Sequence, residues 1–139
     1  MPYTEWTEEL SVGVPIMDEE HKKWLGILNE IHDALKTNAN AEVMQTIIGR
    51  MLEYTIMHLT HEEMYMLHIK YPLFESHREK HNALIRKIEL LDSRLKEKSN
   101  FRLTIDTVFL LKNWLTNHIM VVDKKYKEYI EALNNVEAE

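Results

Sequence analysis

The stretch HLTHEEMYMLHIKYPLFESHREKH, residues 58–81, contains the end of one predicted helix and the start of the next. Tyr71-Pro72 breaks the pattern, because the residue before a proline disfavours the α conformation and proline suits a first helical turn. On either side of the break, apolar and histidine side chains recur at three- and four-residue spacing, which is typical of amphipathic helices. The stretch therefore predicts two long helices joined by a short connection, as in antiparallel bundles.

The same spacing continues outward in both directions and predicts further helices. Residues 1–17 contain Gly13 and Pro15 between alternating apolar residues, which indicates an extended arm, and Asp18 is predicted to cap the helix that follows. The chain, residues 1–139, is therefore expected to form one all-α domain, an up-down-up-down four-helix bundle with an N-terminal arm and a short C-terminal helix. The predicted helices cover residues about 18–37, 41–68, 73–96 and 101–119, with a shorter helical segment at about 121–133.

The composition favours long helices and excludes several classes of site. Only three glycines and three prolines occur in 139 residues, and the absence of cysteine excludes disulfides, thiolate metal sites and iron–sulfur clusters. A formal charge of −6 argues against nucleic acids and anionic membranes as partners. No apolar run approaches the ~20 residues of a membrane helix. Because the N-terminus also lacks the apolar segment of a signal peptide, we expect a cytoplasmic protein without membrane insertion.

Six polar side chains fall on the predicted inward faces of the four long helices, where apolar residues are expected. A single inward histidine is most simply a hydrogen-bonded core residue, but a buried carboxylate costs several kcal/mol unless it is paired or bound to a cation. Five histidines and a glutamate in one small core would leave many polar groups without partners. A metal site would satisfy all of them at once. The six residues are His21, His58, Glu62, His77, His81 and His118.

The spacing of these residues favours two metal ions over one. His58 and Glu62 are four residues apart, as are His77 and His81, so each pair shares one helix face. Six ligands exceed the four of a tetrahedral zinc site, and imidazole with carboxylate suits iron, zinc, manganese or copper. The Glu-x-x-His pattern of ferritin-like di-iron proteins and the His-Glu-x-x-His pattern of metalloproteases are both absent. The residues alone leave the identity of the metal open.

Four segments together resemble the hemerythrin family over nearly the whole chain. They are LSVGVPIMDEEH (residues 10–21), HLTHEEMYM (58–66), YPLFESHREKH (71–81) and NWLTNHIMVVD (113–123). Each segment is weakly specific by itself, but all four in this order and spacing are strongly specific. The single-domain bacterial hemerythrins (bacteriohemerythrins) are the most similar group. The resemblance implies a non-haem centre of two iron ions (Fe²⁺/Fe³⁺) with an oxo or hydroxo bridge.

The resemblance also implies seven metal ligands in three roles. One iron would be held by three histidines, the other by two, and two carboxylates would bridge the ions. The first iron would be held by His77, His81 and His118, and the second by His21 and His58. The bridging carboxylates would be Glu62 and Asp123. The iron with two histidines would keep a vacant position, at which O2 would bind. The remaining histidines, His32, His61 and His68, are not expected to be ligands.

Asp123 is the ligand that spacing does not predict. It lies five residues after His118, about 140° round an α-helix, so an uninterrupted helix would direct the two side chains apart. Both reach one site only if the helix breaks, turns or bulges between them. Without the resemblance, Asp123 would be interpreted as a solvated surface aspartate beside Lys124 and Lys125.

The function implied by the resemblance is reversible binding of O2 for storage, transport or delivery, without net chemistry and therefore without enzymatic turnover. Such binding needs an apolar pocket that limits the entry of water and anions, although small anions could reach the oxidised centre. Apolar residues within a turn of a ligand are the pocket candidates by resemblance, and core packing would explain them equally well. These candidates are Leu59, Trp114, Leu115 and Ile119.

Three other functions are compatible with the sequence. The same centre could reduce NO or peroxide as a detoxifying di-iron enzyme, for which Tyr54 or Tyr65 could supply a phenol. It could act as an oxygen or redox sensor, which would need a separate protein partner because the chain carries no signalling module. A purely structural bundle whose histidines bind nothing is the least favoured, because it would bury many polar groups without partners.

Overall fold

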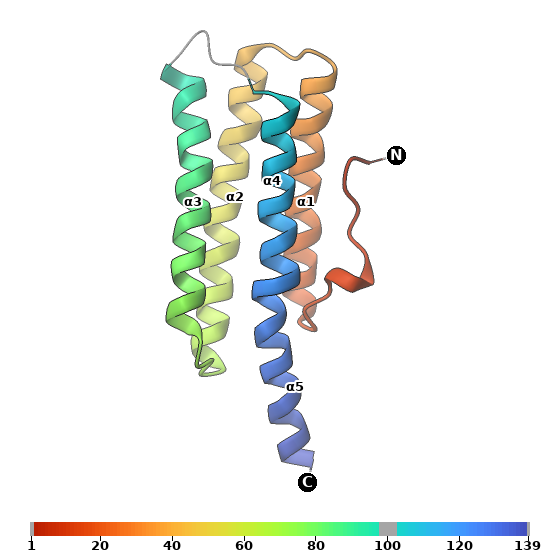
Figure 1. Cartoon of the computed structure of the whole chain (residues 1–139), viewed down its shortest axis with the longest axis vertical. Helices are drawn as coiled ribbons and strands as arrows, with labels where there is room; N and C mark the ends of the chain where they lie inside the picture. Colours follow the sequence, from red (N-terminus) through yellow and green to blue (C-terminus); the bar gives the residue numbers. More distant parts are fainter. Residues whose placement is uncertain (1, 98–102, 139) are drawn as a thin grey trace.

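Four long helices pack antiparallel around one core in this computed structural model, which describes residues 2–97 and 103–138 (Figure 1). A π-helical segment, η2 (His118–Asp123), follows the fourth helix without a break and leads into α5 (Lys124–Ala138). The predicted all-α bundle is confirmed, and the helices break at Tyr71 and Pro72 as the sequence predicts. The long helices are α1 (Pro15–Lys36), α2 (Ala41–His68), α3 (Phe74–Glu97) and α4 (Ile105–Asn117).

α1 begins earlier than predicted, at Pro15 rather than Asp18. Val14 precedes the helix with an extended backbone (φ −122°, ψ 104°), and Pro15 occupies the first turn. Proline is tolerated there because a backbone N–H in the first turn has no partner within the helix. The prediction that Asp18 caps this helix is therefore wrong. Its carboxylate instead accepts hydrogen bonds from the Ser11 hydroxyl (2.6 Å) and the Val12 amide (2.9 Å), so it fixes the turn that leads into α1.

The N-terminal arm lies along α1 (Figure 1). It contains a short 3-10 helix, η1 (Glu8–Leu10), where the sequence analysis predicts only extended chain. Thr4 and Asn29 exchange two hydrogen bonds between their backbone and side-chain groups, at 2.8 and 2.9 Å. The ring of Tyr3 stacks on that of His32 with 4.0 Å between the ring centroids. These contacts fasten the arm to the outer side of α1.

The C-terminal third differs from the prediction at several boundaries. α4 begins at Ile105, where the side chain of Thr104 accepts a hydrogen bond from the Thr107 amide (3.2 Å), and not near residue 101, which lies outside the described residues. The predicted helix 101–119 gives way to the π-helical segment at His118. α5 starts later than the predicted residue 121 and continues to Ala138, beyond the predicted end near residue 133. In Figure 1 it extends past the ends of the other helices.

The interior of the bundle has an apolar end and a polar end. Toward the α1–α2 connection it is filled by buried apolar side chains such as Ile31, Ile48 and Leu111. Toward the α2–α3 connection, buried histidines and carboxylates take their place. Trp24 lies between the two ends, fully buried, and its Nε1 donates a hydrogen bond to Oγ1 of Thr55 at 2.9 Å. In the part of the chain that the structure describes, no helix is long and apolar enough to cross a membrane.

Candidate metal centre

Seven polar side chains meet inside the polar end of the bundle, and all seven residues are buried. They come from α1, α2, α3 and η2, so every side of the bundle contributes to the cluster. The structure thus brings together all the residues that the resemblance implied as metal ligands. They are His21 on α1, His58 and Glu62 on α2, His77 and His81 on α3, and His118 and Asp123 on η2.

The π-helical segment explains how Asp123 reaches the cluster. A π-helix closes i→i+5 hydrogen bonds, so residues five apart return to one face of the helix. His118 and Asp123 are the first and last residues of η2, and Nε2 of His118 lies 2.9 Å from Oδ1 of Asp123. The bulge that the sequence requires between these residues is present. Because Asp123 is fully buried, its interpretation as a solvated surface aspartate is wrong.

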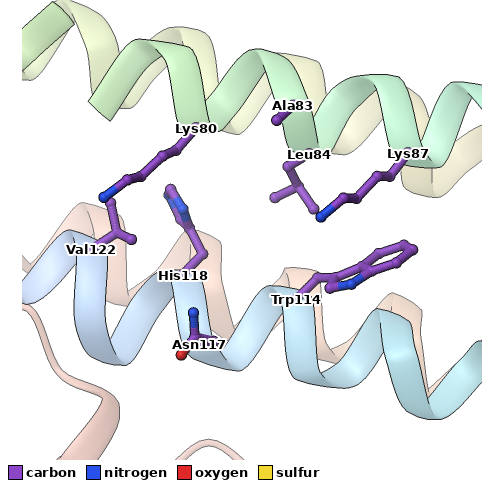
Figure 2. A pocket seen from close by; sticks show the side chains of 8 residues that line it. All are labelled: Lys80, Ala83, Leu84, Lys87, Trp114, Asn117, His118 and Val122. Atoms are coloured by element: carbon purple, nitrogen blue, oxygen red, sulfur yellow. The ribbon is translucent and has the colours of Figure 1, made fainter. Parts of the chain in front are cut away.

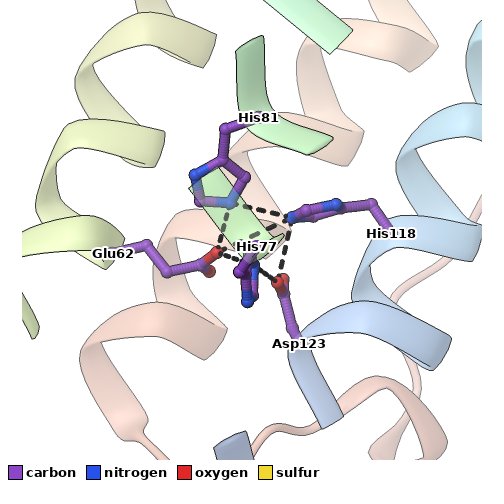
Figure 3. Close-up of side chains that lie close together, drawn as sticks. All are labelled: Glu62, His77, His81, His118 and Asp123. Atoms are coloured by element: carbon purple, nitrogen blue, oxygen red, sulfur yellow. Dashed lines mark hydrogen bonds and ion pairs between the residues drawn. The ribbon is translucent and has the colours of Figure 1, made fainter. Parts of the chain in front are cut away.

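Glu62 divides its two carboxylate oxygens between two groups of histidines, of which Figure 3 draws the one made by His77, His81 and His118. Oε1 faces one group, through Nε2 of His77 (3.0 Å), His81 (2.8 Å) and His118 (3.6 Å). Oε2 faces the other group, through Nε2 of His21 and His58 (both 3.7 Å). We call these sets the three-histidine group and the two-histidine group. Glu62 therefore stands between them and contacts both.

Asp123 divides its oxygens in the same way. Oδ1 lies 2.9 Å from Nε2 of both His77 and His118, in the three-histidine group. Oδ2 lies 3.2 Å from Nε2 of His21, in the two-histidine group. Each carboxylate thus presents one oxygen to each group, an arrangement that suits a pair of cations sharing two bridging ligands.

Several atoms of the cluster are buried without a hydrogen-bond partner among the described residues. Buried polar atoms in folded proteins are normally hydrogen-bonded, and leaving one unsatisfied costs about 1–3 kcal/mol. Nitrogen and oxygen atoms that converge in this way are satisfied together by metal ions, so the residues fit a metal site. The unpartnered atoms are both ring nitrogens of His21, Nε2 of His58, Nε2 of His77 and both carboxylate oxygens of Asp123.

Burial and charge oppose each other in the cluster. Burial alone would lower the pKa of His21, but Asp123 and Glu62 more than offset it and raise the pKa to about 9. At His118 the same carboxylates, Asp123 first, overcome burial and raise the pKa to about 10. Burial would raise the pKa of Glu62, yet the surrounding histidines, His118 first, hold it well below its usual range. The carboxylates stay charged, and protons compete with metal ions for the same ring nitrogens.

Known proteins are similar to this chain in sequence and in fold. Residues 12–130 match the profile of the Hemerythrin HHE cation binding domain. The chain belongs to the hemerythrin family. The buried cluster is accordingly a hemerythrin-type site of histidine, glutamate and aspartate that binds metal.

Individual hemerythrins are similar along most of their length. A bacteriohemerythrin of Stenotrophomonas maltophilia is 26% identical over 127 residues, which cover 91% of this chain and 81% of the relative. A myohemerythrin of Sipunculus nudus is 30% identical over 128 residues, which cover 91% and 92%. A crystal structure of wild-type hemerythrin matches with a TM-score of 0.84 at 28% identity, covering 91% of this chain and 96% of that chain. The similarity to hemerythrins therefore extends over about nine tenths of the chain.

Two glutamates that the sequence analysis missed contact the hemerythrin cluster from outside. Nδ1 of His58 lies 2.7 Å from Oε1 of Glu20, and Nδ1 of His81 lies 3.1 Å from Oε2 of Glu63. A carboxylate on the outer nitrogen fixes the tautomer of the ring and directs Nε2 toward a metal. We call Glu20 and Glu63 the outer carboxylates. Each is the sequence neighbour of a ligand, in DEEH and in HEE, and these paired acids were the signal that could have revealed them.

Tyr126 is a further residue that the sequence analysis missed. It is fully buried, its hydroxyl donates to Oε2 of Glu62 at 3.3 Å, and its ring stacks on that of His77. Burial and then the charge of Glu62 raise the pKa of Tyr126 well above its usual value, so the phenol is a neutral donor. The two tyrosines named from the sequence lie elsewhere. Tyr54 donates to a backbone carbonyl of α1 (2.8 Å), and Tyr65 packs on the ring of Tyr126.

Three of the four expected pocket residues are fully buried, and the fourth is not. Leu59 on α2, Leu115 on α4 and Ile119 on η2 are 0% exposed, each within a turn of a histidine of the cluster. Trp114 is half-buried between α3 and α4, where its ring lies 4.8 Å below the ammonium of Lys87. Trp114 therefore packs against the core while part of its side chain borders solvent.

The histidines that were not expected to be ligands lie outside both histidine groups. His61 is exposed, and its Nδ1 lies 2.8 Å from Oε2 of Glu20, so one glutamate joins it to His58. His32 stacks on Tyr3 of the arm, and His68 is exposed at the end of α2.

Proposed function

We propose that this protein binds O2 reversibly, for storage or delivery, at a pair of iron ions held by the cluster. The observation that carries the proposal is the unequal division of the histidines across Glu62 and Asp123. An ion beside the two-histidine group would have fewer protein ligands, which would leave a coordination position for O2. When bound, the iron pair supplies the electrons that O2 accepts on binding and recovers them on release.

The seven side chains have distinct tasks in this proposal. One iron would be held by His77, His81 and His118, and the other by His21 and His58. Both irons would be held by the two carboxylates, Glu62 and Asp123. The divided carboxylate contacts support this assignment, because a ligand to a single ion would not need both oxygens directed at different histidines.

The surroundings of the two-histidine group suit reversible binding. Reversibility requires that water stay away from the open position. The ring of Trp24 lies 5.0 Å from that of His58 and 6.1 Å from that of His21, measured between centroids, and all three side chains are fully buried. This fully buried aromatic ring against both histidines supports a water-poor environment on this side of the cluster.

Tyr126 positions the carboxylate that both ions share. Its hydroxyl donates to Oε2 of Glu62, the oxygen that faces the two-histidine group. A neutral phenol that stays protonated holds this oxygen in place without adding charge to the site. Tyr126 therefore restricts rotation of the Glu62 carboxylate while ligands bind and leave.

The test is an absorption spectrum of the chain reconstituted with Fe²⁺ under argon and cycled between air and argon. We expect two iron ions per chain, a colour that appears in air, and bleaching when oxygen is removed. The variant His68→Ala removes an exposed histidine and serves as the matched control, with unchanged behaviour expected. Irreversible conversion to a ferric spectrum on the first exposure to air, or failure to retain iron, would overturn the proposal.

One observation favours a second candidate, a di-iron enzyme that reduces peroxide. Tyr126 places a buried phenol against the cluster, and such a group can deliver a proton during turnover. Steady consumption of added hydrogen peroxide by the iron-loaded protein, with ascorbate added as the electron donor that re-reduces the iron pair, would support this candidate if it is lost in Tyr126→Phe. Peroxide consumption no faster than that of free iron in the same buffer would exclude it.

A further inference from the structure

A pocket opens on the surface between α3 and α4, directly over one side of the cluster (Figure 2). Its volume is about 190 Å³, enough for a small ion with part of its water. Lys80 and Lys87 reach across it from α3, and His118 lies between them on the opposite side, as Figure 2 shows. Trp114 and Asn117 complete the α4 side. The pocket therefore connects solvent with the back of a proposed metal ligand.

His118 differs from two other histidines of the cluster in what its outer edge meets. His58 and His81 each contact an outer carboxylate, Glu20 or Glu63, through Nδ1. Among the described residues, the acidic neighbours of His118 are Glu62 and Asp123, which belong to the cluster. Both contact the inner nitrogen of the His118 ring, Nε2. His118 also lines the pocket, unlike the other histidines of the cluster. No acidic residue among those described takes the position at His118 that Glu20 takes at His58.

The charge around the pocket suits an anion at that position. Lys80 and Lys87 form no ion pair with any carboxylate in the described parts of the chain, although the chain as a whole carries a charge of −6. The ammonium of Lys87 is held over the ring of Trp114, 4.8 Å from its centroid, so it stays at the rim of the pocket. An oxoanion can accept hydrogen bonds from two ammonium groups and from an imidazole N–H that lies between them.

We propose that this pocket is an exchangeable site for a small oxoanion, which supplies to His118 the outer partner that Glu20 and Glu63 supply to His58 and His81. The anion accepts hydrogen bonds from Lys80, Lys87 and the Nδ1–H of His118 and does not bind the metal. An acceptor on the outer nitrogen raises the basicity of a metal-bound imidazole, so occupancy tunes the three-histidine side. The coupling to metal rests on the proposed function, whereas anion binding in the pocket does not.

The first measurement is a titration of the full-length protein with sodium sulfate at constant ionic strength, followed by NMR. Sulfate keeps its charge near neutral pH and is a weak iron ligand. We expect saturable shifts of the Trp114 indole N–H and of backbone amides around Lys80, Lys87 and Asn117. Shifts that stay linear with sulfate, or that spread over the whole surface, would show screening alone and overturn the site.

The matched variants separate the pocket from general charge effects. Lys80→Met with Lys87→Met keeps an unbranched side chain and a similar helix propensity and removes both ammonium groups. We expect sulfate affinity to fall about tenfold or more. Lys23→Met with Lys36→Met removes the same charge elsewhere on the surface and should leave the affinity unchanged. Equal weakening in both double variants would overturn the proposal.

The second measurement is the absorption spectrum of the iron-loaded protein during the same titration. We expect a small spectral shift that saturates at the sulfate concentration found by NMR and that disappears in the Lys80/Lys87 variant. A shift that persists in that variant would mean that sulfate reaches the metal directly, against the proposal. If the chain retains no iron but the NMR shifts saturate, the proposed function fails while the anion site stands. If the chain retains iron but the NMR shifts do not saturate, the anion site fails while the proposed function stands.

Discussion

The three-histidine and two-histidine groups share Glu62 and Asp123 but differ in their access to solvent. On the three-histidine side, His118 borders a surface pocket between α3 and α4. On the two-histidine side, His21 and His58 are 0% exposed and lie against the buried ring of Trp24. The side with three histidines is thus nearer to solvent, and the side with two is buried. In the proposed function, this difference would separate retention of metal from binding of O2.

The largest expected effect comes from removing a histidine that contacts both carboxylates. Nε2 of His77 lies 3.0 Å from Glu62 and 2.9 Å from Asp123, so His77→Ala removes a ligand from the centre of the three-histidine group. We expect most of the iron and all of the oxygen-dependent colour to be lost. The gain in unfolding free energy on adding iron, about 2.7 kcal/mol at a hundredfold excess over Kd, should disappear with it. Iron content per chain and thermal melts with and without Fe²⁺ measure both.

A companion variant tests whether the two groups are separable. His21→Ala removes one of two histidines on the sealed side, and we expect it to retain about one iron per chain without any response to oxygen. His68→Ala again serves as the control, because His68 is exposed at the end of α2. Full iron content in His77→Ala, or an unchanged oxygen response in His21→Ala, would contradict the division of ligands.

The next effect in size concerns the bridge contributed by η2. Asp123→Asn keeps the volume of the side chain and removes the charge that both groups share. We expect weaker retention of the second iron, with iron content between that of the parent and that of His77→Ala. Asp33→Asn, at an aspartate whose side chain is 74% exposed, is the matched control. Parental iron content in Asp123→Asn would show that Asp123 is not a bridging ligand.

Helix periodicity predicted most of the cluster, because four of its members form i,i+4 pairs and all but one lie on apolar stripes. Asp123 could not be predicted in this way, since its position depends on a π-helical segment between His118 and Asp123. A π turn leaves no simple periodic signal; it is stabilised by the packing of the helices around it. Only the resemblance to hemerythrins pointed to this residue. The burial that decides its role became visible in the structure alone.

The wrong helix start shows a second limit of local rules. Asp18 has the chemistry of a helix cap, and the sequence analysis used it as one. In the fold, the carboxylate of Asp18 accepts hydrogen bonds from the Val12 amide and the Ser11 hydroxyl, which both precede the helix. Similarly, nothing in the periodicity distinguished Glu20 from its neighbour Glu19, yet Glu20 contacts His58 and Glu19 pairs with a surface lysine. Which of two adjacent acids faces the cluster is decided by the helix packing.

The outer carboxylates allow the two groups to be tuned one at a time. Glu20 contacts His58 on the two-histidine side, and Glu63 contacts His81 on the three-histidine side. Losing such an outer partner typically lowers metal affinity about 10–100-fold. We expect Glu20→Gln to weaken mainly the iron that responds to oxygen, and Glu63→Gln mainly the other.

Competition with a chelator during anaerobic titration measures the two affinities, and Glu30→Gln, an exposed glutamate paired with Arg50, is the control. Identical losses in Glu20→Gln and Glu63→Gln would mean that the outer carboxylates act on the cluster as a whole. An unchanged affinity in both variants would limit them to a structural role.

The smallest expected effect is at Tyr126, which touches the shared carboxylate from outside both groups. Tyr126→Phe keeps the ring stacked on His77 and removes only the hydrogen bond to Oε2 of Glu62, which at 3.3 Å is a long one. The loss should cost about 1 kcal/mol of unfolding free energy and leave the iron content unchanged. Because this oxygen faces the two-histidine group, we expect the oxygen-dependent colour to decay faster, as the Glu62 carboxylate rotates more freely. If the unfolding free energy falls but the colour decays at an unchanged rate, Tyr126 contributes only to packing. If the colour decays faster, reversibility is controlled at Glu62, the carboxylate that joins the two groups.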